Sequence, residues 1–279
     1  MKDGNGSPTV LTRPGVEPAW AAPIALLLHG YNVDPQQSAN SFERLLIAVN
    51  QASPPLPALL AMKSWLVYWQ GYTSGGLNRG KTLSSPAHYA AQIPSAVEAA
   101  QALEEYLYNR AGAGARITLI AHSLGCRVAL ELLDRIASSS RLPKPTFPLV
   151  VLMAAAVPIY FLEDLRSLWK GALLPERTVV LFSRGDQILN YCFRLDQTIA
   201  GEGLFPKAIG ASGLPAGFWS STVATRNAHS GYFSDSVTGE AIARFLGAPA
   251  PMNLPMVDSR TRISGGIAMV LPSISLPSR

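Results

Sequence analysis

The sequence predicts an α/β protein in which a mostly parallel sheet carries helices on both faces. Short apolar runs alternate with stretches of helical periodicity along most of the 279 residues. Several runs are apolar at nearly every position, which is typical of parallel strands that are covered on both faces. The segments between them are long enough for helical crossovers. We therefore expect an open sheet between two layers of helices.

Six strands and five helices follow from this pattern. The helix predicted over 95–110 shows the basis of the assignment, because its apolar residues recur three and four positions apart and it lies between Pro94 and the Gly112–Gly114 pair. The predicted strands are 24–28, 65–69, 117–120, 149–153, 178–182 and 218–223. The predicted helices are 38–50, 95–110, 125–137, 161–170 and 236–246.

One domain accounts for most of the chain. Residues 21–247 contain all the predicted strands and helices. Residues 1–20 form an N-terminal extension rich in Gly, Pro and Thr, and residues 248–279 form a C-terminal tail rich in Pro and Ser. We expect both ends to be peripheral, although IAMVLPSISL at 267–276 is apolar enough to dock on a sheet edge.

Composition narrows the class of protein. Hydrophobic residues make up 48% of the chain and charged residues 15%, with a mean hydropathy of +0.18, which is too apolar for a disordered protein. No run reaches the roughly 18 apolar residues of a membrane-spanning helix. The first twenty residues lack the apolar centre of a secretory signal. We therefore expect a soluble, cytoplasmic protein with no membrane span.

Charge and cysteine content exclude further classes. The net charge is +5 and the isoelectric point is about 9.3, but the basic residues are scattered instead of forming a stripe with interleaved aromatic residues. Nucleic-acid binding is therefore not expected. Cys126 and Cys192 lie in no metal or redox spacing, so we expect two buried free thiols, no metal and no cofactor. The oligomeric state is left open.

The clearest chemical signal is AHSLG at 121–125, which joins a predicted strand to a predicted helix. It matches the nucleophile elbow G-x-S-x-G with Ala121 in place of the first glycine. Such a turn holds Ser123 in a strained conformation with its hydroxyl clear of the sheet, and the flanking residues must be small because strand and helix approach closely. The helix also directs its positive dipole end at the serine. Ser123 is the predicted nucleophile; the alternative is an ordinary serine in a strand-to-helix loop.

The rest of a catalytic triad is predicted by chain order. This arrangement places the acid and then the histidine after the serine. His229 is the one histidine downstream of Ser123 and lies in a loop before the last predicted helix, so it is the candidate base. Asp186 follows the strand predicted over 178–182, where a carboxylate can orient the imidazole. Three other acids are rivals for that role: Glu163, Asp164 and Asp196.

An oxyanion hole is predicted from two segments. The strand 24–28 ends in His29-Gly30-Tyr31, where glycine allows a turn that brings a backbone N–H towards the serine. We expect the amides of Tyr31 and Leu124 to form the hole. His29 and His122 are expected to support the site by packing, as are Gly30 and Gly125.

These motifs resemble the α/β-hydrolase superfamily. LLLHGYN, AHSLG, SRGD and NAHSGYF follow one another over about residues 22–247, and the chain is most similar to bacterial serine hydrolases that carry an HGYN segment. The resemblance implies an esterase, lipase or thioesterase that acts through an acyl-serine intermediate and needs no cofactor. Ala121 departs from the usual glycine, as in relatives with AHS-type elbows.

The substrate is less well defined by the sequence. The helix predicted over 161–170 is too short for a large cap, so we expect a small cap or none. Aromatic residues near one strand end and leucines of that helix are candidates for a pocket, with ordinary sheet packing as the alternative for the leucines. We expect a small-to-medium apolar ester. The candidate pocket residues are Trp69, Tyr72, Leu162 and Leu165.

The sequence suggests two alternative functions. A catalytically silent binding module would keep the fold without the chemistry, but it would have little reason to retain Ser123, Asp186 and His229 together. A nucleotide-binding protein is suggested by Gly75–Thr82, which matches the P-loop pattern. A P-loop needs a strand directly before it and a helix directly after it. Here Gln70–Ser74 separate the predicted strand from Gly75, and Pro86 lies four residues after Thr82, where the interior of that helix would need a backbone N–H.

Overall fold

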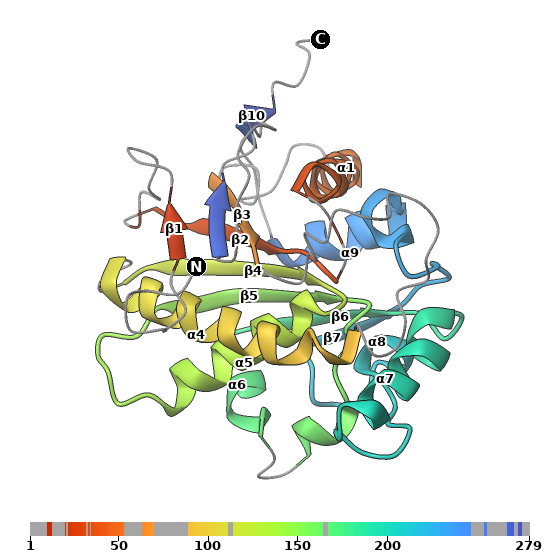
Figure 1. Cartoon of the computed structure of the whole chain (residues 1–279). Helices are drawn as coiled ribbons and strands as arrows, with labels where there is room; N and C mark the ends of the chain where they lie inside the picture. Colours follow the sequence, from red (N-terminus) through yellow and green to blue (C-terminus); the bar gives the residue numbers. More distant parts are fainter. Residues whose placement is uncertain are drawn as a thin grey trace.

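The computed structural model describes residues 10–12, 20, 22–31, 33, 35–52, 63–69, 89–110, 114–163, 167–246, 254–255, 267–270 and 273–274. At its centre is an eight-stranded sheet in the order β1-β9-β3-β2-β4-β5-β6-β7 (Figure 1). Six adjacent strands of this order, β3-β2-β4-β5-β6-β7, are parallel to one another, which confirms the predicted α/β architecture. They are β2 (Ile24–Leu28), β3 (Lys63–Tyr68), β4 (Arg116–His122), β5 (Thr146–Met153), β6 (Thr178–Phe182) and β7 (Ser221–Ala224).

Short segments near the two chain ends extend one edge of this sheet. β9 (Ile267–Val270) pairs antiparallel with β3, and β1 (Val10–Thr12) pairs parallel with β9. The apolar IAMV sequence of β9 therefore lies on the sheet edge, as its composition suggested. β8 (Leu254–Pro255) and β10 (Ser273–Ile274) form a separate antiparallel pair.

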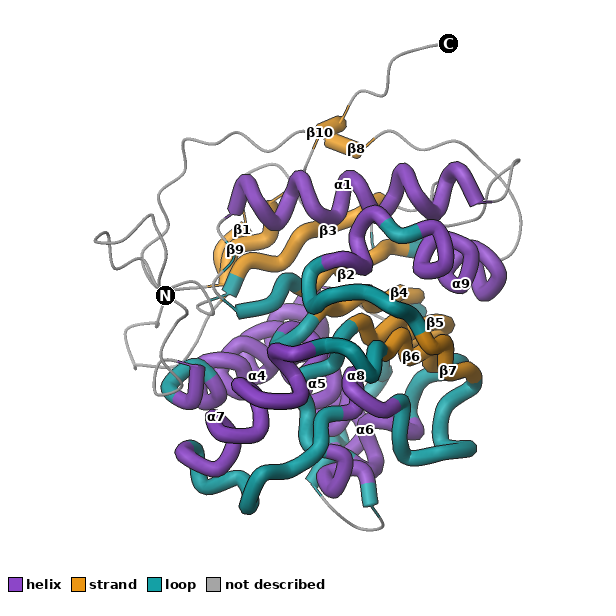
Figure 2. The backbone as a smooth tube through the Cα atoms, turned by 90° about the vertical axis from the view of Figure 1, so that its right-hand side faces the viewer, coloured by secondary structure: helices purple, strands orange, loops and turns teal. Residues whose placement is uncertain are grey.

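Helices cover both faces of the sheet. α1 (Pro35–Ala52) packs with α9 (Ser236–Leu246) on one face, and α4 (Ile93–Arg110), α5 (Gly125–Ser138) and α6 (Trp169–Leu173) lie on the other (Figures 1 and 2). Because helices bury both faces, every residue of β2 and β6 is buried, and their sequences are continuously apolar. No described helix is long and apolar enough to cross a membrane.

Short helices gather where the strands end. They are η1 (Ile159–Leu162) after β5, η2 (Ile188–Cys192), α7 (Phe193–Ile199) and α8 (Ile209–Ser212) between β6 and β7, and η3 (Gly231–Ser234) before α9. The sequence pattern did not predict η2, α7 or α8. Cys192 lies here and is only partly buried, so the expectation of two buried thiols is correct for Cys126 alone.

The helix predicted over 161–170 is wrong as one element. η1 ends at Leu162, Glu163 has extended backbone (φ −70°, ψ 156°), and α6 begins at Trp169. Contacts with other elements decide this break. The Tyr160 hydroxyl donates to the carbonyl of Glu202 over 2.6 Å, and Phe161 packs under the Arg127 guanidinium. These tertiary contacts, and not the helical periodicity of the sequence, determine the local structure here.

The last predicted strand is displaced along the chain. The structure places β7 at Ser221–Ala224, where 218–223 was expected. Phe218 is instead in a turn, with its amide bonded to Pro215 O, and its ring packs on Trp169. Trp219 is buried. These aromatic residues made the segment resemble a strand, but their burial comes from helix and loop contacts.

Candidate active site

The predicted site residues come from four strand ends on one edge of the sheet. Ser123 follows β4, His29 to Tyr31 follow β2, Asp186 lies in the loop after β6, and His229 lies in the loop after β7. Since these strands are parallel, their carboxyl ends meet at the same edge, where open α/β sheets bind ligands. The fold therefore brings segments about a hundred residues apart to one place.

Ser123 occupies a strained turn between β4 and α5. Its φ is +55°, a left-handed conformation that is uncommon for residues other than glycine. Its amide donates to the carbonyl of Met153 over 2.9 Å, and its carbonyl accepts from the Cys126 amide at 3.0 Å and from the Ala156 amide at 3.2 Å. Neighbouring backbone thus holds the turn that the AHSLG pattern predicted.

Two glycines permit this turn for steric reasons. A Cβ atom at Gly125 would lie against the carbonyl oxygens of His29 and Leu28, at 2.5 Å from the latter. A Cβ atom at Gly30 would lie 2.9 Å from the Cβ of Ser123. The start of α5 and the loop after β2 are therefore packed too closely for any larger residue without a backbone shift.

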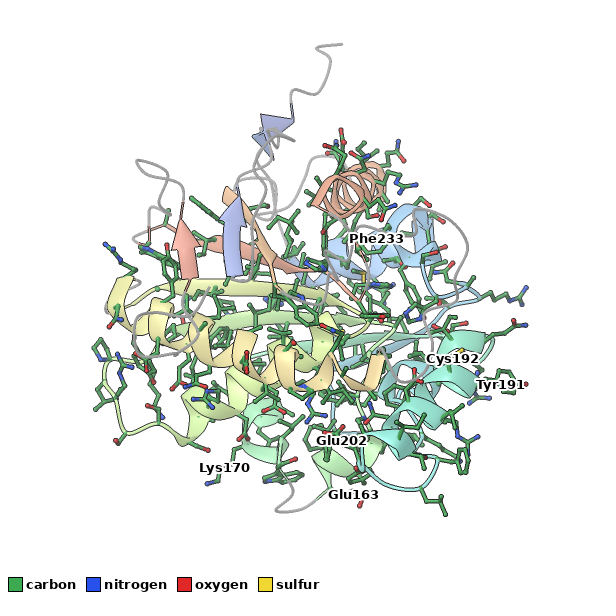
Figure 3. The ribbon with its side chains drawn as sticks, viewed as in Figure 1. Glu163, Lys170, Tyr191, Cys192, Glu202 and Phe233 are labelled. Carbon is green, nitrogen blue, oxygen red and sulfur yellow. The ribbon has the colours of Figure 1, made fainter. Side chains whose placement is uncertain are left out.

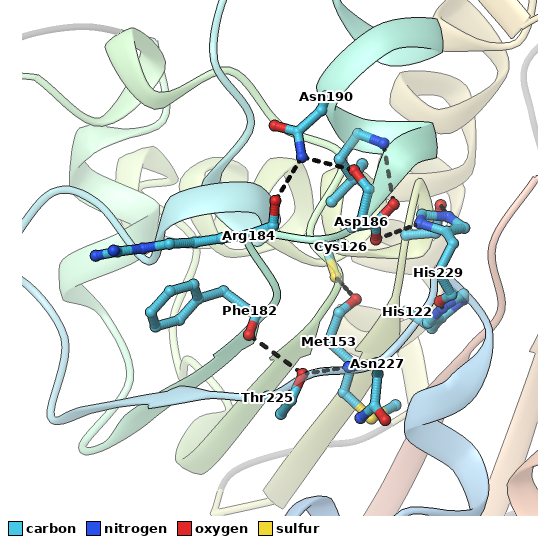
Figure 4. A network of polar contacts seen from close by, with 12 residues as sticks. His122, Cys126, Met153, Phe182, Arg184, Asp186, Asn190, Thr225, Asn227 and His229 are labelled. Carbon is cyan, nitrogen blue, oxygen red and sulfur yellow. Dashed lines mark hydrogen bonds and ion pairs between the residues drawn. The ribbon is translucent and has the colours of Figure 1, made fainter.

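The hydroxyl, imidazole and carboxylate predicted from chain order are in hydrogen-bond contact. Ser123 Oγ lies 2.8 Å from His229 Nε2. His229 Nδ1 lies 2.8 Å from Asp186 Oδ2, a contact that Figure 4 shows. Because a carboxylate accepts, Nδ1 carries the proton of a neutral ring, and Nε2 is free to accept from the serine. This is the hydrogen-bond order that a serine nucleophile and its base require.

Asp186 is fully buried and held on both oxygens. Oδ1 accepts from the Leu189 amide at 3.1 Å, while Oδ2 faces His229. The Asn190 side-chain amide donates to the carbonyls of Asp186 and Arg184, at 2.8 and 2.9 Å, and fixes the loop (Figure 4). The rivals make no such contact among the described residues, since Glu163 is exposed and Asp196 is not bonded to His229. Asp164 is outside the described residues.

The loop carrying His229 is hydrogen-bonded to the ends of two strands, β6 and β4. Thr225 donates through its amide and hydroxyl to the carbonyl of Phe182 at the end of β6, at 2.8 and 3.2 Å (Figure 4). His122 Nε2 lies 2.8 Å from the carbonyl of His229 and must donate to it. The His122 ring also packs on Phe233, with ring centroids 4.7 Å apart.

Both supporting histidines are neutral because they are buried. Burial lowers the pKa of His122 to about 3, helped by the neighbouring His229, and lowers the pKa of His29 to about 4. His29 Nδ1 donates to the carbonyl of Gly30 at 2.7 Å. Neither ring is placed to exchange a proton with Ser123; each holds a segment of backbone.

Two of the four pocket candidates, Trp69 and Leu162, lie among the described residues. Trp69 is buried, stacks on His29 and donates through its indole N–H to the carbonyl of His29 over 3.0 Å, so it supports the loop after β2. Leu162 is fully buried in the hydrophobic core, which is the packing alternative. Tyr72, Leu165 and the segment Gly75–Thr82 are outside the described residues.

The oxyanion donors were predicted as the amides of Leu124 and Tyr31. Because the Ser123 amide is already bonded to Met153, the next amide along the chain is the nearest alternative. Leu124 precedes the first turn of α5, where N–H groups have no acceptor within the helix and the dipole is positive. Tyr31 lies directly after Gly30, and its ring meets the edge of the Tyr89 ring, with centroids 5.6 Å apart.

Several supporting residues carried no sequence signal. Met153 and Ala156 hold the serine turn, Asn190 holds the acid loop, and Thr225 holds the histidine loop. Of these residues, only Asn190 could have been proposed from the sequence as a partner of Asp186, because it lies four residues later in the chain. Among the described residues, no group of three or more His, Cys, Asp or Glu side chains is arranged to hold a metal ion.

Three solved structures are similar to the chain at low sequence identity. An esterase from Pyrobaculum calidifontis is 11% identical, with 80% of this chain and 76% of that chain covered and a TM-score of 0.40. A carboxylesterase from Bacillus subtilis is 11% identical, with 81% and 83% covered and a TM-score of 0.41. An esterase from Pyrococcus furiosus is 11% identical, with 81% and 82% covered and a TM-score of 0.37.

Comparison with protein-family models identifies the family of the chain. No protein of curated function matches the sequence significantly. The family described as "Alpha/beta hydrolase of unknown function (DUF900)" matches residues 18–203, which is more than half of the chain and includes the strand ends that carry Gly30, Ser123 and Asp186. Together with the parallel sheet and the serine turn, this match identifies the chain as a member of that family of α/β hydrolases.

Proposed function

We propose that this protein is a serine hydrolase that cleaves a carboxylic ester or thioester through an acyl-serine intermediate. The observation that carries the proposal is the continuous hydrogen-bond chain from Ser123 Oγ through His229 to Asp186, with both contacts at 2.8 Å. A serine hydroxyl becomes a useful nucleophile only when a base can take its proton. In this proposal His229 is the base, and Asp186 is the acid that orients it.

The first half of the reaction forms the acyl-enzyme. Ser123 Oγ attacks the carbonyl carbon while its proton passes to His229 Nε2, and Asp186 stabilises the imidazolium cation that results. The tetrahedral oxyanion is stabilised by the amides of Leu124 and Tyr31 and by the positive end of α5. The carbonyl–oxygen or carbonyl–sulfur bond then breaks, and His229 returns its proton to the leaving alcohol or thiol.

The second half releases the acid. Water takes the place of the leaving group and gives a proton to His229 as it attacks the acyl carbon. The intermediate breaks down to the free acid, and Ser123 recovers its proton. These steps use only groups of this chain and water. A small-to-medium apolar ester remains the proposed substrate class.

The experiment is labelling with a fluorophosphonate probe, which reacts with activated serines. Wild-type protein should be labelled and Ser123→Ala should not. Ser183→Ala is a matched control, because this serine is also buried and its hydroxyl has no hydrogen-bond partner among the described residues. It should be labelled like the wild type. An ester and thioester panel would then define the substrate.

Two outcomes would contradict the proposal. Equal labelling of wild type and Ser123→Ala would place the reactive group elsewhere. Failure to label a folded wild type, together with no turnover of any ester in the panel, would favour the silent binding module, for which ligand-induced thermal stabilisation is the appropriate screen.

A further inference from the structure

The segment that follows Asp186 displays apolar side chains to solvent. Along η2 and α7 the exposed residues recur at intervals of three and four, so they lie on one side of this helical segment. Two more follow in the turn after α7. Tyr191 projects outward at the right-hand edge of the molecule in Figure 3. We call this set the apolar face: Ile188, Tyr191, Leu195, Ile199, Leu204 and Phe205.

The turn after α7 is built to hold its two apolar side chains outward. Phe205 has φ +46°, which is unusual for a bulky residue and must be held by its surroundings. Its amide donates to Thr198 Oγ1 at 2.8 Å, and its carbonyl accepts from Arg194 Nε at 3.1 Å. Leu204 beside it is 80% exposed. The exposure of this pair is therefore part of a bonded turn.

The same turn is fixed to the helix that begins at the serine elbow. The carboxylate of Glu202 pairs with both terminal nitrogens of Arg127 in α5, each at 3.1 Å. The Glu202 carbonyl also accepts from the Tyr160 hydroxyl at 2.6 Å. The apolar face is thus held in a set position relative to Ser123.

Within the segment 184–207, which carries the apolar face, the charges left at the surface have one sign. Arg184 and Lys207, at the two ends of this part of the chain, are exposed, and Arg194 within it is partly exposed. The three acids of the same segment are taken up elsewhere. Asp186 and Asp196 are buried, and Glu202 is paired with Arg127. What remains at the surface is an apolar area with a cationic border, in a chain of net charge +5.

This charge pattern decides between possible occupants. In a two-fold dimer the same face would meet itself, and the cationic borders would be brought together. An anionic partner is favoured instead. Aliphatic and aromatic residues bordered by Arg and Lys are the composition of segments that lie in the surface of anionic membranes.

We propose that the apolar face docks on an anionic lipid surface. Leu204, Phe205 and Tyr191 enter the acyl region, and Arg184, Arg194 and Lys207 lie at the headgroups. Docking in this way places the lipid beside the sheet edge that carries Ser123, so an ester held in the lipid would lie next to the site. The docking itself does not depend on the proposed chemistry.

The test is co-sedimentation of the full chain with sucrose-loaded vesicles. We expect binding to phosphatidylglycerol vesicles, weaker binding to phosphatidylcholine vesicles, and a decrease with added salt. Leu204→Ser and Tyr191→Ser should each weaken binding by about fivefold or more, because each removes an apolar side chain from the acyl region. Both side chains are largely exposed, so thermal unfolding should be unchanged.

Leu142→Ser is the matched control. Leu142 is 81% exposed, as Leu204 is, but it lies between α5 and β5, at the opposite edge of the sheet. It should bind like the wild type, and so should Ser123→Ala, which separates this proposal from the catalytic one. Equal binding to both kinds of vesicle, equal loss in Leu142→Ser, or a dimer that Leu204→Ser dissociates would each overturn the proposal.

Discussion

His122 is bonded to the backbone of His229, and not to Ser123 beside it. Its Nε2 proton is donated to the His229 carbonyl over 2.8 Å, and its low pKa of about 3 keeps the ring neutral. The residue next to Ser123 therefore positions His229 through the main chain. This relationship is the basis of the first prediction.

His122→Phe should slow acylation without weakening substrate binding. The variant keeps a ring against Phe233 but leaves the part-buried carbonyl of His229 without its donor, so we expect kcat to fall roughly five- to tenfold with little change in KM. His122→Gln, which retains a donor, should recover part of the rate. Steady-state kinetics on an ester substrate measures both. A change in KM with kcat unaltered would argue against a role of His122 in positioning His229.

Asp186→Asn should be close to inactive while remaining folded. The amide oxygen would keep the Leu189 N–H, so the new NH2 group would take the place of Oδ2 and donate to His229 Nδ1. The ring proton then lies on Nε2, which cannot accept from Ser123, and kcat should fall on the order of a thousandfold to ten-thousandfold. Steady-state kinetics on an ester substrate measures this change. Asp196→Asn is the control, because Asp196 was a rival acid that does not contact His229. Equal loss in both variants would remove Asp186 from its proposed role.

Gly125→Ala should destabilise the protein through a backbone clash. The new methyl group would meet the carbonyl oxygens of His29 and Leu28, which cannot move like a side chain. We expect the free energy of unfolding in urea to fall by about 1–3 kcal/mol. Gly185→Ala is the control, since its Cβ would approach only Ser183 Oγ, at 3.7 Å, and should change stability by no more than about 0.5 kcal/mol.

Asp196→Asn should stabilise the protein, and more so at high pH. Burial raises the pKa of Asp196 to about 7, and its Oδ1 has no hydrogen-bond partner among the described residues. In the unfolded chain the carboxyl ionises near its usual pKa of about 3.9, so above pH 7 the folded state bears the unfavourable charge. Nearby solvent screens part of this effect, and we expect a gain of about 1 kcal/mol at pH 8.

The pH dependence of that gain checks its cause. As the pH falls through 7, the folded wild-type protein takes up the proton and recovers its stability, so the gain should shrink towards pH 4. Urea unfolding of both proteins at pH 8 and pH 5 measures it. His29 and His122 are present in both proteins, so their own titration cancels. A gain that stays constant with pH would show that packing, and not charge, is responsible.

Local sequence accounts for much of the fold. β2 and β6 begin and end where their apolar runs do, and α9 spans the predicted residues, because continuous apolar runs and helical periodicity are imposed by burial between layers. The helix over 161–170 failed where Tyr160 and Phe161 are bound by Glu202 and Arg127, residues distant in the chain. Helices η2 and α7 were not predicted because apolar residues lie on both their buried and their exposed sides, which obscures the contrast between an apolar and a polar face.

The candidate site divides in the same way. By itself the sequence identified Ser123 as the candidate nucleophile, since a small-residue strand-to-helix turn is a local motif, and chain order left His229 as the candidate base. Only the tertiary structure shows that Asp186, and not Asp196, is bonded to His229. It also shows that Trp69 is bonded to the His29 carbonyl and that His122 donates to the His229 carbonyl. These contacts depend on which strand ends meet across the sheet, and hydrogen bonds of about 3 Å between residues forty or a hundred positions apart leave no periodic trace in the chain.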